Sequence, residues 1–125
     1  MNTLILLVES ESSWSPLVWA LEQGGESAED GRIVIEGRLG WLSIEPDQSV
    51  LDDFDDDERA DAVAALVDPS LFVIEWRGDV LIETFVRAVP SDSRVFVDNE
   101  HGVFAPVTVL RNIPFASWAR AISVL

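Results

Sequence analysis

LILLV at residues 4–8 is a continuous apolar run, and LFVIEW at residues 71–76 is a second run of the same kind. Short apolar runs of this length, rich in branched side chains, are typical of β-strands that are buried on both faces. We therefore predict two buried strands, one near the N-terminus and one in the middle of the chain.

Shorter β-rich runs lie outward from these two. RIVIE at residues 32–36 and the run at residues 41–44 are separated by glycines, and this pattern predicts a β-hairpin. A second hairpin is predicted from strands at residues 94–98 and 103–109, joined by a turn at residues 99–102. The chain therefore carries at least six predicted strands.

A first helix is predicted to begin at Ser15-Pro16, because Ser suits the N-cap and Pro suits the first helical position. Gly24-Gly25 ends it. The spacing predicts an apolar stripe that faces the core and consists of Trp14, Leu17, Val18 and Leu21. Trp19 is offset from this stripe, and we expect it to be partly exposed.

Three further segments are interpreted as helical. Asp55 and Glu58 have the form of a capping box, which predicts a helix that ends before Asp68-Pro69. Residues 80–89 fit either a helix capped by Asp79 or the second strand of a hairpin, and the helix is favoured. Residues 115–124 close the chain as a short helix.

These elements predict an α+β fold: a mostly antiparallel sheet with helices on one face, within a single domain of residues 1–125. Residues 4–45 and 71–109 form a possible internal repeat, because both read strand–helix–strand–strand. The pattern D-x-R-[IV]-x-[IV]-[DE] occurs at residues 30–36 and 92–98. Duplication and convergence both explain it; duplication predicts two units around a pseudo-two-fold axis.

The composition excludes many functions. The 125 residues include 48% hydrophobic side chains, 23 acids and 8 Arg, with a net charge of −15. This charge disfavours nucleic acid and anionic membranes as partners. With no Cys, no Lys and one His, disulfides, Schiff-base chemistry, the P-loop and multi-His metal sites are excluded. Without a signal peptide or membrane span in the sequence, we expect a cytoplasmic protein.

Residues 45–61 form an acidic connector between the two candidate repeats and carry a net charge of −8. One or two acids would satisfy a helix N-terminus, so the clustering of nine suggests a basic partner outside the chain. Alternatively, the segment is an ordinary solvated surface. It does not match an EF-hand calcium loop, because the glycine and the final Glu of that loop are missing. The candidate partner-binding residues are Asp52, Asp53, Phe54, Asp55, Asp56, Asp57, Glu58, Asp61 and Trp19.

Candidate catalytic groups are sparse. His101 lies in DNEHG at residues 98–102, which is more simply a polar turn. Glu36, Glu45, Glu75 and Glu83 lie in or beside predicted strands and helices, where alternation toward solvent explains them. We therefore expect no enzyme, no metal site and no cofactor.

In size, acidity and lack of catalytic motifs the chain resembles the immunity proteins of bacterial toxin systems. The resemblance implies an inhibitor that binds and neutralises a basic cognate toxin, such as a nuclease. The tandem strand–helix–strand–strand pattern is also similar to the duplicated units of GyrI-like effector-binding domains. That alternative implies a groove that binds cationic or aromatic small molecules near an acidic residue.

Overall fold

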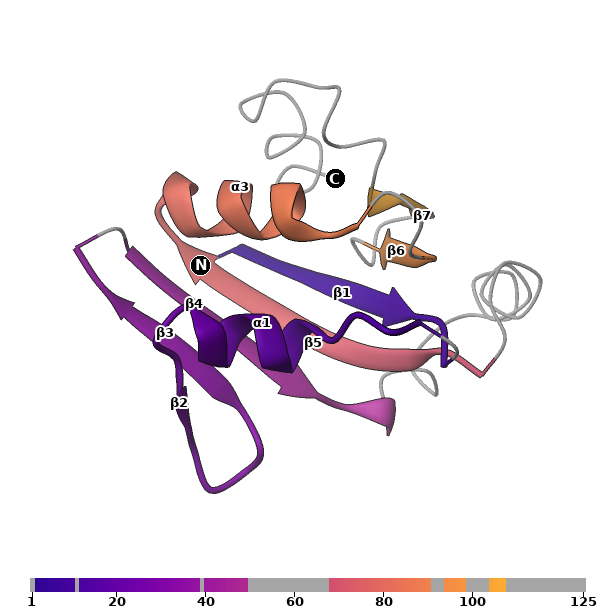
Figure 1. Ribbon diagram of the computed structural model, residues 1–125, viewed down its shortest axis with the longest axis horizontal. Helices are drawn as coiled ribbons and strands as arrows, with labels where there is room; N and C mark the ends of the chain where they lie inside the picture. Colours follow the sequence, from indigo (N-terminus) through magenta and orange to yellow (C-terminus); the bar gives the residue numbers. More distant parts are fainter. Residues whose placement is uncertain are drawn as a thin grey trace.

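The computed structural model describes residues 2–10, 12–38, 40–49, 68–90, 94–98 and 104–107. The predicted helices after Asp55 and at residues 115–124, and the turn at residues 99–102, lie outside these ranges. The described elements, drawn in Figure 1, are β1 (Asn2–Val8), α1 (Pro16–Glu22), β2 (Glu26–Ser27), β3 (Ile33–Gly37), β4 (Gly40–Pro46), β5 (Ser70–Arg77), α3 (Asp79–Ala88), β6 (Val95–Asp98) and β7 (Phe104–Pro106).

The strands form one sheet in the order β2-β3-β4-β5-β1-β6-β7, and every described pairing is antiparallel. The two apolar runs that predict buried strands become neighbours at its centre. β1 and β5 pair over seven residues, from Asn2 opposite Trp76 to Val8 opposite Ser70. Both faces of these two strands are buried, since Ile5, Leu7 and Leu71 are as inaccessible as the residues that alternate with them, and this explains why their sequences are so continuously apolar.

Helices α1 and α3 pack on the same face of the sheet, above its middle strands (Figure 1). The main core lies between these two layers. Its buried strand residues alternate along each strand, as the two-residue period of a pleated sheet requires. They are Leu4, Leu6, Val8, Ile33, Ile35, Leu42, Ile44, Phe72, Ile74, Trp76, Val95 and Val97. The predicted α+β class, with helices on one face of an antiparallel sheet, is confirmed.

The ambiguous residues 80–89 are helical, as favoured. Leu81, Ile82, Phe85 and Val86 are buried on one side of α3. Glu83 and Arg87 form an ion pair one turn apart on its exposed side. Gly78 rather than Asp79 is the N-cap, with a φ of 81° that favours glycine, and Asp79 lies in the first turn.

The expected pseudo-two-fold relation between the repeats fails in the sheet. Both units contain a strand, a helix and a hairpin in that order, but the first has the additional strand β2 between its helix and its hairpin. In the first unit the second hairpin strand, β4, lies beside β5, and β3 lies outside it. In the second unit the first hairpin strand, β6, lies beside β1, and β7 lies outside it. An axis between β1 and β5 would therefore exchange strands that hold different places in the chain.

The predicted hairpin of β3 and β4 is confirmed, and its geometry requires a glycine at position 40. Gly37 pairs with Gly40 across the turn. Gly40 has a φ of 124°, and a Cβ there would lie 2.4 Å from the carbonyl oxygen of Arg77. A side chain at this position would therefore push β4 away from β5. The short strand β2 is not among the predicted strands.

Candidate functional site

The acidic residues of the predicted partner-binding segment, and Phe54 with them, lie outside the described residues. Trp19 does not, and the expectation that it is partly exposed is wrong. Its exposed fraction is 7%, and its ring meets that of Phe85 edge-on, with centroids 5.2 Å apart. Trp19 is therefore part of the core and is not a surface anchor.

The orientation of α1 has a physical reason. Pro16, Trp19 and Ala20 are spaced i, i+3 and i+4, so they form a second helical stripe that competes with the predicted one. This stripe packs against the sheet, and all three residues are buried. Of the predicted stripe, Trp14 and Leu17 pack against the core from its margin.

The other two members of the predicted stripe, Val18 and Leu21, have exposed fractions of 53% and 49%. They lie three residues apart and share the outward face of α1. An exposed pair of aliphatic side chains on one helix face is available for contact with another protein. We name this pair the α1 ridge.

An acidic arm follows α1 directly. It comprises residues 22–31, which end the helix and form β2 and the turn into β3. Its acids are all exposed: Glu22, Glu26, Glu29 and Asp30. Glu36, at the other end of β3, is exposed too.

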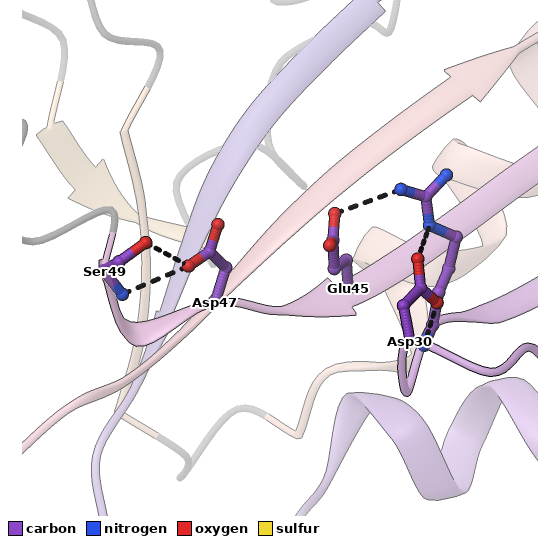
Figure 2. A network of polar contacts seen from close by, with 5 residues as sticks. Asp30, Glu45, Asp47 and Ser49 are labelled. Carbon is purple, nitrogen blue, oxygen red and sulfur yellow. Dashed lines mark hydrogen bonds and ion pairs between the residues drawn. The ribbon is translucent and has the colours of Figure 1, made fainter.

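Arg32, the basic residue nearest to the acidic arm in sequence, already forms ion pairs within the chain. Arg32 lies 3.2 Å from the carboxylate of Glu45 and 3.6 Å from that of Asp30, and Figure 2 shows this network together with the contact between Asp47 and Ser49. Within the described ranges, Glu22, Glu26, Glu29 and Glu36 have no ion pair. The acidic arm therefore presents carboxylates that the described part of the chain does not neutralise.

Part of the acidic arm borders an open depression of about 480 Å³ at the edge of the sheet. Glu26 and Val34 are opposite each other in the β2–β3 register, so they share a face with Glu36, two residues further along β3. The depression is lined by Gly24, Glu26, Ser27, Ala28, Val34 and Glu36. Its charged lining is acidic only, which suits a cationic group.

The four candidate catalytic carboxylates do not lie together. By strand alternation, Glu36, Glu45 and Glu75 lie on the sheet face away from the helices, whereas Glu83 is on α3. Glu45 pairs with Arg32, and Glu83 pairs with Arg87. Across the described segments, no three potential metal ligands converge. His101 lies outside them.

Sequence reasoning missed this candidate site because its acids, from Glu22 in the acidic arm to Glu36 in β3, are spread over fifteen residues rather than clustered. Only the pairing of β2 with β3 brings Glu26 and Glu36 to one depression. No helix in the described part of the chain is long and apolar enough to cross a membrane. Comparison with protein families, with curated protein sequences and with solved structures finds no match.

Proposed function

We propose that the protein is a stoichiometric binding protein for a basic protein partner, acting as an immunity-type inhibitor that neutralises a cognate toxin such as a nuclease. The net charge of −15 supports this proposal because it favours cationic partners and accelerates their encounter. The partner contacts combine the acidic connector at residues 45–61 with the acidic arm at residues 22–31.

The observation that carries the proposal is the α1 ridge together with the exposed Glu22, the first acid of the acidic arm, which lies one helical turn after Val18. Protein interfaces have an apolar centre and a polar rim. Val18 and Leu21 supply exposed aliphatic groups, and Glu22 follows them directly in the chain. Carboxylates left without counter-charges repel one another, and a basic partner relieves this repulsion.

The alternative, a small-molecule effector-binding module, requires an enclosed groove lined by Trp beside a buried Glu. The depression at the sheet edge has no Trp in its lining, and both of its carboxylates are exposed. Trp19 and Trp76 are buried in the core. These features favour a protein partner over a small aromatic cation.

Affinity capture with the full chain, from the cells that produce it, tests the proposal. We expect one basic protein to be retained at low salt, with a yield that falls as salt rises because exposed charge pairs are screened. Calorimetry with the purified partner should then give one molecule bound per chain. If no basic protein is captured at low salt or at moderate salt, the proposal is contradicted.

A charge-neutralised variant locates the contact. Replacing Asp52, Asp53, Asp55, Asp56 and Asp57 together by Asn should slow association with the captured partner and flatten its salt dependence. The control variant carries Asp68→Asn, Asp79→Asn and Glu83→Gln. If the control loses as much affinity per charge removed as the connector variant, the connector has no special role.

A further inference from the structure

The outer edge of β3 is only partly covered. β2 pairs with two of the five residues of β3, Ile33 and Val34. On the N-terminal side of β2 the chain turns away at Gly25, whose N–H bonds to the carbonyl of Ala20 in α1. Among the described residues, the C-terminal half of β3 therefore has no strand beside it on that edge.

The register shows which backbone groups this leaves open. Gly37 and Gly40 close a two-residue turn, so they form a hydrogen-bonded pair. Bonded and non-bonded pairs alternate along an antiparallel ladder, so the N–H and C=O of Glu36 point away from β4. The bond from the Ala28 N–H to the carbonyl of Arg32, 2.8 Å long, shows the same alternation at the residue that directly precedes β3.

The open edge and the acidic depression coincide. Glu36 lines the depression together with Glu26 of β2, and both residues are exposed. No hydrogen bond within the described residues reaches the outer edge of Glu36. An extended chain that paired with Glu36 would therefore place the side chain of the residue opposite Glu36 on the sheet face that carries Glu26 and Glu36.

The negative charges of Glu26 and Glu36 determine which kind of chain can pair with this edge. A second copy of this chain would bring Glu26 and Glu36 against their own equivalents, and like charges on an edge strand prevent such pairing. An arginine or lysine side chain fits the same place with complementary charge.

We propose that the open edge of β3 docks an extended segment of a basic protein, whose main chain pairs with Glu36 and whose Arg or Lys side chain enters the depression between Glu26 and Glu36. This is strand addition, in which main-chain bonds supply affinity and the depression supplies specificity. The inference rests on the proposed function and identifies the edge of β3 as the part of the surface that recognises the partner.

A peptide titration of the full chain tests the proposal. The probe is a capped pentapeptide of alternating arginine and valine, and the readout is the amide NMR spectrum. We expect shifts confined to Gly24–Ala28 and Val34–Gly37, with slowed exchange of the Glu36 amide. A peptide of alternating arginine and proline should bind more weakly and should not protect that amide, because proline disfavours strand pairing.

Charge variants sharpen the test. Glu26→Gln with Glu36→Gln should weaken binding of the arginine–valine peptide roughly three- to tenfold, as expected for two exposed charge pairs. The matched control, Glu75→Gln, lies on the same sheet face but outside the depression and should change the affinity less than about twofold. Both variants are isosteric, and circular dichroism verifies that they fold.

Peptide shifts that centre elsewhere, or equal losses in the Glu26/Glu36 and Glu75 variants, would overturn the inference. It would also be overturned if a captured basic partner bound the Glu26/Glu36 variant as tightly as the parent chain, although the proposed function would then stand. The proposed function fails separately when no basic protein is captured at all.

Discussion

The orientation of α1 can be tested by comparing Trp19→Ala with Leu21→Ala. The structure buries Trp19 to 7% exposure and leaves Leu21 at 49%. A buried Trp→Ala change costs about 3–5 kcal/mol of unfolding free energy, through lost transfer energy and the cavity that remains. Leu21→Ala should cost less than about 1 kcal/mol, because half of that side chain already contacts water.

The opposite helix orientation predicts different numbers. If Val18 and Leu21 faced the sheet, Leu21→Ala would cost about 2–5 kcal/mol, the usual range for a buried leucine. Trp19→Ala would then cost little. The two orientations therefore differ by several kcal/mol at each position, well beyond the error of equilibrium unfolding.

The assay is urea unfolding followed by far-ultraviolet circular dichroism, which reads all variants alike whether or not they keep Trp19. The midpoint should fall sharply for Trp19→Ala and slightly for Leu21→Ala, with unchanged slope if both variants remain two-state. A loss for Leu21→Ala that equals or exceeds the loss for Trp19→Ala would refute the packing of α1 described above.

A double-mutant cycle then tests the specific ring contact. Trp19 and Phe85 meet with centroids 5.2 Å apart and planes at 71°, an edge-to-face geometry. Such pairs contribute about 0.5–1.5 kcal/mol beyond their buried area. The cycle uses Trp19→Leu and Phe85→Leu to limit the cavity. A coupling energy of zero would show that the two rings do not interact in solution.

Three further changes probe local features by the same unfolding assay. Gly40→Ala should cost at least about 2 kcal/mol, because its φ of 124° strains an L residue and the new Cβ would lie 2.4 Å from the Arg77 carbonyl oxygen; a neutral effect would contradict the β4–β5 register. Ser15→Ala removes the acceptor of the Val18 N–H and should cost about 0.5–1 kcal/mol, so no loss would mean that the cap does not form. Ser43→Ala should be neutral or stabilising, since its hydroxyl is buried with no hydrogen-bond partner in the described part of the chain, and a loss of more than about 1 kcal/mol would reveal a missing partner.

Local patterns in the sequence were enough to predict the described helices and every described strand except the two-residue β2. The apolar runs at residues 4–8 and 71–76 specify strands because their side chains can be buried on both faces of a sheet. Ser15-Pro16 specifies where α1 begins, because the hydroxyl accepts a backbone N–H and proline has none to satisfy. The glycines around residues 37–40 mark a turn. Each of these features depends on groups only a few residues apart.

Tertiary structure decided what local patterns leave degenerate. Two stripes of α1 were equally periodic, and packing selected the one that holds Trp19, because its ring buries more apolar area against Phe85 than Leu21 could. The strand order depends on which strands pair in the folded sheet, and local sequence does not determine this. The two hairpins therefore take opposite places in the sheet although their sequences are alike. The candidate site is of the same kind. Glu26 and Glu36 are ten residues apart in a chain rich in acids, and only the antiparallel turn between β2 and β3 brings them to one depression beside an open strand edge.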